Sequence, residues 1–128
     1  MFLKINDCKN AKKSVIIGNV YRSPSKMPCK FNELLESVLG KLERHKNKHV
    51  LLLGDFNMDL IKHDTDIKSQ NLIETTTNRG FVQIISRPKR ITDHSATLID
   101  HIYTNQINKV SSSGVITLDL SDHLATLA

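Results

Sequence analysis

The chain alternates between apolar runs and polar segments, and the spacing within each run predicts an element. Residues 14–21 are rich in β-branched side chains and precede a Ser/Pro-rich segment, which predicts a strand followed by a turn at residues 22–28. Residues 49–53 are a second aliphatic run, which stops at Gly54 and predicts a buried strand closed by a tight turn. Between them a helix is expected, with one apolar stripe made by Phe31, Leu34, Leu35, Val38, Leu39 and Leu42. Because strand-helix-strand connections are right-handed, the two strands are expected to be parallel if they share a sheet.

The remainder of the chain predicts one more helix and three more strands. The helix is expected at residues 68–79 with Gly80 at its C-cap, and the strands at residues 81–85, 96–103 and 115–120. Strands and helices that alternate in this way predict an α/β (α+β) layered sandwich.

Composition narrows the class of protein further. The 128 residues are enough for one domain or for part of a larger one, and a hydrophobic fraction of 39% is enough for a core. The absence of Trp and an aromatic fraction of 5% argue against a base-stacking surface for single-stranded nucleic acid. The 18 Lys and Arg against 13 Asp and Glu give a formal charge of +5, which favours a polyanionic partner such as DNA.

Cysteine usage and the first residues bear on the compartment. Cys8 and Cys29 fit neither a disulfide framework nor a zinc site, so a reducing compartment is the simpler interpretation. Residues 1–7 contain no apolar run long enough for a signal peptide, and nothing approaches a span of roughly 20 apolar residues. We expect an intracellular protein, nuclear or cytoplasmic, which is not secreted and not bound to a membrane. The sequence leaves its oligomeric state open.

Asp55 and Asn57 follow the strand that stops at Gly54, and they are the first candidates for chemistry. A carboxylate at a strand end could bind a hard cation or take a proton from water, and an amide could hold a phosphate oxygen. Asp and Asn also shape turns by bonding their own backbone, which explains both residues equally well at this point.

Asp100 is a second candidate because strand alternation places it on an otherwise apolar face with Leu98 and Ile102. Burying a carboxylate is costly unless it is paired, and His123 is a suitable partner. His101 faces the other way, and we expect it to be a surface or packing residue.

Asp122 and His123 are the third candidate, in the triplet Ser121-Asp122-His123. An imidazole held by a carboxylate can act as general acid or base, or stabilise a developing oxyanion as imidazolium. The triplet alone is explained as well by a Ser or Asx turn. Three separate strand ends that carry such residues are harder to explain by turns.

Together these segments resemble the endonuclease/exonuclease/phosphatase superfamily, and within it the apurinic-like endonuclease domain of non-LTR retrotransposons. The resemblance runs from about Ser14 to Leu124. It is carried by Val20-Tyr21-Arg22-Ser23-Pro24, Leu52-Leu53-Gly54-Asp55-Phe56-Asn57, Ser95-Ala96-Thr97-Leu98-Ile99-Asp100, Ile99-Asp100-His101-Ile102 and Ser121-Asp122-His123.

The resemblance implies a role for each matching residue. Asp55 would orient or deprotonate the attacking water, and Asn57 would hold that water and a phosphate oxygen. Tyr21 would contact the scissile phosphate or its leaving oxygen.

The resemblance also implies a metal site. Asp100 would pair with the ring of His123, which stabilises charge on the phosphate. Asp122 would help to bind Mg²⁺ (or Mn²⁺), which acts as a Lewis acid on the phosphate.

The chain departs from the family pattern at its amino-terminal end. The family carries an Asn and a metal-binding Glu in its amino-terminal half, and residues 1–13 contain no segment that matches them. We therefore expect residues 1–13 to be an extension. Residues 14–128 are expected to form a partial domain truncated at both ends, a four-layer fold without its amino-terminal half. The metal would then be weakly held.

Two polar segments outside these motifs have competing interpretations. Arg87, Lys89 and Arg90 could contact a DNA backbone at the rim of the site, or could form a solvated basic loop. Asp59, His63, Asp64 and Asp66 hint at a cation cluster, but their spacing fits no calcium loop, and a polar surface loop is expected.

These observations support three hypotheses about function. The first is Mg²⁺-dependent phosphodiester hydrolysis of DNA, the nick that a retroelement uses for insertion. The second is a non-catalytic remnant that binds nucleic acid weakly. The third is a phosphatase or phosphodiesterase acting on a substrate other than nucleic acid, such as a phosphoinositide or sphingomyelin, against which the element-like segment 95–100 argues.

Overall fold

A computed structural model describes residues 2–6, 14–45, 47–85, 90–92, 95–116 and 125–127 of the chain. Two α-helices, nine strands and three short 3-10 helices are assigned within these ranges. Their bounds, in chain order, are β1 Phe2–Asn6, β2 Ser14–Tyr21, α1 Pro28–Leu42, η1 Glu43–His45, β3 His49–Asp55, η2 Leu60–Lys62, α2 Ile67–Asn78, β4 Val82–Gln83, β5 Arg90–Thr92, β6 Ser95–Thr97, β7 Asp100–Thr104, η3 Ile107–Lys109, β8 Gly114–Ile116 and β9 Ala125–Leu127.

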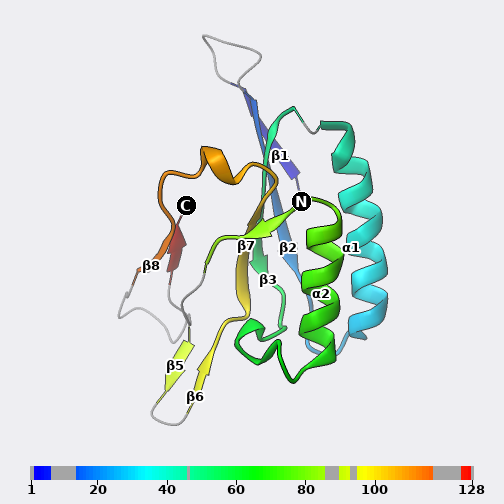
Figure 1. Cartoon of the computed structure of the whole chain (residues 1–128), viewed down its shortest axis with the longest axis vertical. Coiled ribbons are helices and arrows are strands. Elements are labelled where there is room, and N and C mark those ends of the chain that lie inside the picture. Colours follow the sequence, from blue (N-terminus) through cyan, green and yellow to red (C-terminus); the bar gives the residue numbers. More distant parts are fainter. Residues whose placement is uncertain are drawn as a thin grey trace.

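The central sheet has five strands in the order β1-β2-β3-β7-β4 (Figure 1). Strands β2 and β3 are parallel, as the strand-helix-strand order predicts, and β1 and β7 pair antiparallel to them on either side. Two further pairs, β5-β6 and β8-β9, form separate two-stranded sheets. Because β2 and β3 run in the same direction, their carboxyl ends meet at one edge of the sheet.

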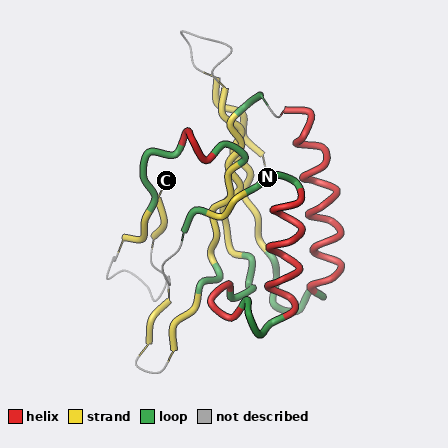
Figure 2. Tube along the Cα trace, in the orientation of Figure 1, coloured by secondary structure: helices red, strands yellow, loops and turns green. Residues whose placement is uncertain are grey.

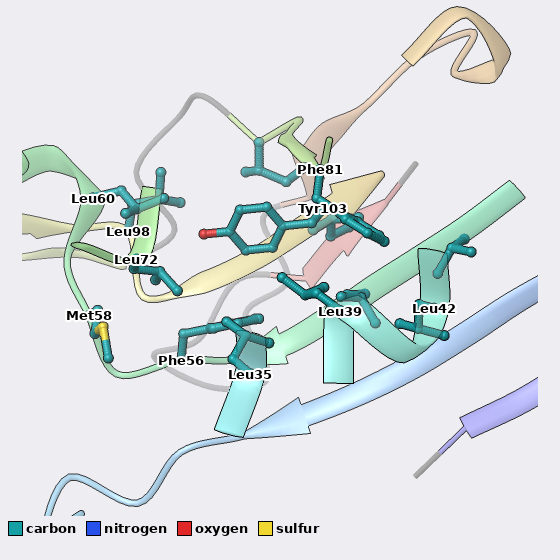
Figure 3. Packing of buried hydrophobic residues seen from close by; sticks show 14 of the residues in the cluster. Leu35, Leu39, Leu42, Phe56, Met58, Leu60, Leu72, Phe81, Leu98 and Tyr103 are labelled. Carbon is teal, nitrogen blue, oxygen red and sulfur yellow. The ribbon is translucent and has the colours of Figure 1, made fainter. Parts of the chain in front are cut away.

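Both helices cover the same face of the central sheet, as Figure 2 shows, so sheet and helices form layers as the sequence predicted. The core lies between them, with Leu39, Phe56, Leu72 and Tyr103 almost fully buried (Figure 3). At roughly 25 cal/mol per Å² of apolar surface, this burial is the main force that holds the helices on the sheet.

The apolar stripe predicted for the first helix is wrong at Leu34. Leu35, Leu39 and Leu42 are buried, whereas Leu34 is 65% exposed. Leu34 lines a groove of about 940 Å³ that also includes Phe2 of β1. Helical spacing alone therefore does not determine which side chains of the stripe are buried.

Helix α2 begins and ends one residue earlier than predicted, with a polar group at each end. The carboxylate of Asp66 accepts from the backbone N–H of Lys68 at 3.2 Å, a bond typical of an N-cap. At the other end Gly80 has a φ of 71°, a left-handed conformation that favours glycine. The N–H of Phe81 then donates to the carbonyl of Thr76 at 2.9 Å and turns the chain back toward the sheet.

The single strand predicted at residues 96–103 is wrong, because the structure divides it into β6 and β7. The two residues between them bond to other loops instead of continuing the strand. The N–H of Leu98 donates to the Asp59 carboxylate at 2.9 Å, and its carbonyl accepts from Leu60 at 3.0 Å. The carbonyl of Ile99 accepts from Phe56 at 2.9 Å. These partners are distant in sequence, so strand alternation alone could not reveal the break.

The remaining differences concern short strands and the ends of the chain. Strand β4 is shorter than the predicted 81–85, and of the predicted 115–120 the structure describes only the start, within β8. Part of the expected extension at residues 1–13 forms β1 at the edge of the central sheet. Within the described ranges, no helix combines the length and hydrophobicity needed to cross a bilayer.

Candidate active site

Three strand ends meet at one edge of the central sheet and bring Tyr21, Asp55 and Asp100 together. Asp55 is in register with Tyr21 of β2 on one side and with Asp100 of β7 on the other. Residues in direct register point to the same face of a sheet. Tyr103 pairs with Leu52 and is buried in the core, so the alternate positions that include Asp55 and Asp100 face away from the helices.

Gly54 lets β3 pass close to β2 immediately before Asp55. Its φ is 144°, and a Cβ atom built there would overlap the carbonyl oxygen of Val20. The sequence predicted that Gly54 closes the strand in a turn, but β3 continues to Asp55. The glycine therefore allows a close backbone approach within the sheet, and the turn begins one residue later.

The turn after β3 joins Asp55 to Asn57 directly. The N–H of Asn57 donates to Asp55 Oδ1 at 2.9 Å, and Asn57 has a φ of 48°, which Asn tolerates better than most residues. The turn interpretation of these two residues is thus correct as far as it goes. It leaves the placement of Asp55 beside Tyr21 and Asp100 unexplained, and that placement comes from the register of three strands.

The sequence predicted a turn at Arg22. In the structure Arg22 lies against the turn that carries Asp55 and Asn57, here called the corner. Its backbone N–H donates to the carbonyl of Asp55 at 2.9 Å, and its own carbonyl accepts from Asn57 Nδ2 at 2.8 Å. The one sequence signal that could have found it is an arginine placed directly after a buried strand.

Behind the corner, a cluster of rings supports the segment that carries Asp100. Phe56 is fully buried and stacks on His101, with ring centroids 4.8 Å apart. His101 bonds through Nε2 to the carbonyl of Leu98 at 3.0 Å, and its Nδ1 lies 3.3 Å from the hydroxyl of Tyr103. His101 was predicted as a surface or packing residue, and its 1% exposure shows that it packs.

Burial decides the protonation state of these rings. Burial lowers the pKa of His101, although its hydrogen bonds to backbone carbonyls and the nearby carboxylates of Asp100 and Asp55 act in the opposite direction. A neutral His101 donates from Nε2 to the Leu98 carbonyl and accepts at Nδ1 from the hydroxyl of Tyr103. Burial also raises the pKa of Tyr103, which keeps that hydroxyl protonated.

The structure places some predicted site residues and leaves others outside the described residues. Tyr21 is 70% exposed at the end of β2, and Asp55, Asn57 and Asp100 are half-buried near it. The residues outside the described ranges are Arg87, Lys89, Asp122 and His123, and of Arg90 only the backbone in β5 is described. The pairing of Asp100 with His123 therefore remains a prediction.

The carboxylates of Asp55 and Asp100 offer part of a ligand set for a divalent cation. Like charges directly opposite on neighbouring strands repel, and a cation beside them relieves that repulsion. Mg²⁺ is commonly held by one or two carboxylates, with water and substrate phosphate as the other ligands. Within the part of the chain that the structure describes, no group of three or more His, Cys, Asp or Glu residues is placed to hold a metal. Asp55 and Asp100 therefore offer carboxylate oxygens of the kind that Mg²⁺ prefers, and the described residues do not form a complete ligand set with them.

Comparison with solved structures identifies the fold. The chain superposes on the endonuclease domain of TRAS1, a telomere-specific non-LTR retrotransposon, with a TM-score of 0.70, 15% identity and coverage of 98% of this chain and 65% of that one. An endonuclease/exonuclease/phosphatase family protein from Leptotrichia buccalis gives a TM-score of 0.63, 17% identity and coverage of 98% and 51%. Beta toxin from Staphylococcus aureus gives 0.55, 12%, 98% and 52%.

The chain spans about half to two thirds of the length of these structures, which agrees with the partial domain expected from the sequence. The search of curated proteins found no match. The family described as "Endonuclease-reverse transcriptase" matches residues 15–127. The chain therefore belongs to the endonuclease-reverse transcriptase family and has an endonuclease/exonuclease/phosphatase fold.

Proposed function

We propose that this chain is the part of a Mg²⁺-dependent DNA endonuclease that activates the attacking water, in an enzyme that makes the nick used by a retroelement for insertion. The observation that carries the proposal is the register that places Asp55 beside Tyr21 and Asp100 at one sheet edge. The family match supports a nuclease, and the retrotransposon endonuclease among the structural neighbours supports a retroelement.

In the proposed reaction, the corner formed by Asp55 and Asn57 prepares the nucleophile. Asp55 orients the attacking water and takes its proton, while its Oδ1 is held by the N–H of Asn57. Asn57 steadies the same water and a phosphate oxygen. Tyr21, exposed at the end of β2, contacts the scissile phosphate or its leaving oxygen.

The phosphate itself is stabilised from the Asp100 side in this proposal. Asp100 orients the ring of His123, which as imidazolium offsets negative charge on the phosphate. Asp122 would help to hold Mg²⁺ or Mn²⁺, and the bound cation would supply Lewis acidity toward the phosphate oxygens.

The partner in this proposal is double-stranded DNA, approached through its backbone. The formal charge of +5 favours such a partner, and Arg87, Lys89 and Arg90 would contact phosphates beside the site. Contacts to DNA phosphates weaken as the salt concentration rises, because the release of counterions on binding is then less favourable. Charge reversal at these three positions should therefore reduce both the binding and its salt dependence.

Plasmid nicking tests the proposal directly. The purified chain, and a version extended at its amino terminus with the remainder of a complete domain, are incubated with supercoiled plasmid in Mg²⁺. Asp55→Asn keeps an acceptor for the N–H of Asn57 but removes the base, and we expect it to lower nicking by about 100-fold or more. Asp66→Asn is the matched control because its carboxylate caps α2, and it should leave nicking unchanged. Equal nicking by Asp55→Asn and the unchanged chain would exclude the assigned role.

A second candidate function is a non-catalytic remnant that binds nucleic acid weakly. The observation that favours it is that, within the described residues, no group of three or more His, Cys, Asp or Glu side chains is placed to hold a metal. It predicts salt-sensitive plasmid binding without turnover in either version, whereas turnover that depends on Asp55 or His123 rules it out. Release of phosphate from a lipid head group, with no nicking of plasmid, would instead indicate a phosphatase of the same fold.

A further inference from the structure

Arg22 is buried directly beneath the turn that carries Asp55 and Asn57. It follows the last residue of β2 and is only 6% exposed. Its Nε donates to the carbonyl of Phe56 at 2.7 Å, and its Nη2 donates to the carbonyl of Asn57 at 2.6 Å. The guanidinium therefore donates hydrogen bonds to two consecutive carbonyls of the turn.

The same guanidinium also anchors the loop that follows β2. Its Nη1 donates to the carbonyl of Lys26 at 2.7 Å and to that of Ser23 at 3.2 Å. A planar fork with five donors can reach carbonyls in two loops at once with a fixed geometry, which an ammonium group on a flexible stem cannot do. Arg22 thus links the loop after β2 to the turn after β3.

The backbone of Arg22 completes the connection. Its N–H bonds to the carbonyl of Asp55 at 2.9 Å, and its carbonyl accepts from Asn57 Nδ2 at 2.8 Å. Residue 22 therefore holds each of the three residues from 55 to 57, and it fixes the amide side chain of Asn57 as well as the main chain.

The task of linking two loops does not by itself explain why the residue at position 22 is charged. Every partner of its guanidinium within the described residues is a backbone carbonyl oxygen. Burying a cation without a carboxylate is costly, and a neutral donor could join two loops without that cost. What a charged, rigid fork provides in addition is a fixed geometry and a positive field beneath the Asp55 corner.

We propose that Arg22 is a positioning residue for the hydrolytic site, and that it holds the side chains of Asp55 and Asn57 in the geometry that water activation requires. This inference rests on the proposed function. Because Arg22 is buried, it acts through the turn and does not touch the DNA. A displacement of about 1 Å at a reacting group can lower the rate by about 100-fold, so loosening the turn should act on turnover.

The kinetic test uses Arg22→Lys, with Arg79→Lys as the matched control. We expect Arg22→Lys to lower kcat for plasmid nicking by about 100-fold while KM for the plasmid stays the same. Arg79 bonds Glu36 and Glu43 on the surface, so its substitution should leave both constants unchanged. Methylguanidinium at millimolar concentration should restore part of the activity of Arg22→Ala by filling the vacated position.

Three kinetic results would overturn the inference. An unchanged kcat in Arg22→Lys excludes a positioning role. A raised KM with unchanged kcat shows that Arg22 binds DNA directly. A loss of kcat that merely follows the folded fraction, measured by thermal unfolding in the same buffer, shows that Arg22 serves stability only.

A spectroscopic test separates this inference from the proposed function. If neither the chain nor its extended version nicks DNA, the proposed reaction fails, but the NMR signals of the Asn57 side-chain amide still report on the hydrogen bonds of Arg22 to the turn, here called the clamp. We expect them to shift in Arg22→Lys while the amide signal of Thr76 in α2 stays in place, and unshifted Asn57 signals contradict the inference. If the variants do not fold, hydrogen exchange at Arg22 Nε in the unchanged chain decides. Exchange as fast as that of the exposed Arg44 shows that no clamp exists, and slower exchange supports one.

Discussion

Acidic residues lie at the end of β3 and in the loop that follows it, and the fold places their carboxylates very differently. Asp55 lies on the face of the sheet away from the helices, in register with Tyr21 and Asp100. In residues 59–66, by contrast, Asp59 and Asp66 accept hydrogen bonds from the backbone at the start of a helical turn, and Asp64 is a surface residue. This difference shows that an acid becomes a site candidate through the residues that the sheet register places beside it. The number of acids does not decide, because residues 59–66 contain more acids than the segment around Asp55.

The largest effect is expected from Gly54→Ala, which tests whether the corner depends on close contact between β2 and β3. An added Cβ would overlap the carbonyl oxygen of Val20, so one strand must move. We expect a loss of several kcal/mol in the free energy of unfolding, measured by urea denaturation, or no folded protein at all. Gly80→Ala is the matched control because Gly80 also has a positive φ, but its Cβ would meet no atom within 4 Å. Its cost should be about 1 kcal/mol, and an equal cost at the two glycines would contradict the close approach.

The elements of the fold were predictable where the pattern is local. The spacing of apolar residues predicted β2, α1 and β3, and the crossover rule predicted that the two strands are parallel. That alone brings Tyr21 and Asp55 to one edge. The antiparallel pairing of β7, which adds Asp100 to them, was not predicted, but its strand character was.

The features that sequence could not predict depend on partners far along the chain. The break between β6 and β7 is made by hydrogen bonds with Asp59 and Phe56, and Leu34 is exposed although it has the same helical spacing as buried residues. Arg22 belongs to the same class. Its partners at Phe56 and Asn57 lie 34 and 35 residues away, so the local sequence could not reveal these contacts.

A smaller effect is expected from Asp59→Ala, which tests whether the acidic segment is structural. The carboxylate of Asp59 accepts from the N–H of Ile61 at 3.2 Å and from that of Leu98 at 2.9 Å. Its removal leaves both donors without this acceptor, so we expect a loss of about 2 kcal/mol in the free energy of unfolding. Asp59→Asn keeps one acceptor oxygen and should recover most of the stability. A loss of nicking in Asp59→Asn without loss of stability would instead assign this residue to the site.

His101 provides a pH-dependent test of the ring cluster behind the corner. Burial lowers the pKa of His101 in the folded chain, whereas an unperturbed histidine, as in the unfolded chain, has a pKa of about 6.5. Below that value the unfolded chain binds the proton first, so stability is highest above pH 6.5 and falls as the pH decreases toward the folded pKa. Thermal unfolding between pH 5 and pH 8 should show this slope, and His101→Gln should reduce it. His45→Gln, at an exposed position, should leave the slope unchanged.

The smallest effect is expected from Asp64→Asn, at the most exposed carboxylate of the acidic segment. Asp64 forms an ion pair with His63 at 3.1 Å, but its side chain is 85% exposed, and surface pairs of this kind contribute little. We expect a change within about 0.5 kcal/mol in the free energy of unfolding and unchanged nicking. The same substitution at Asp55 should also leave stability nearly unchanged, because Asn keeps the acceptor for the N–H of Asn57, but it should strongly reduce nicking because the charge is lost. If Asp64→Asn also abolished nicking, the two segments would share one site. The distinction between a functional corner and a structural loop would then be wrong.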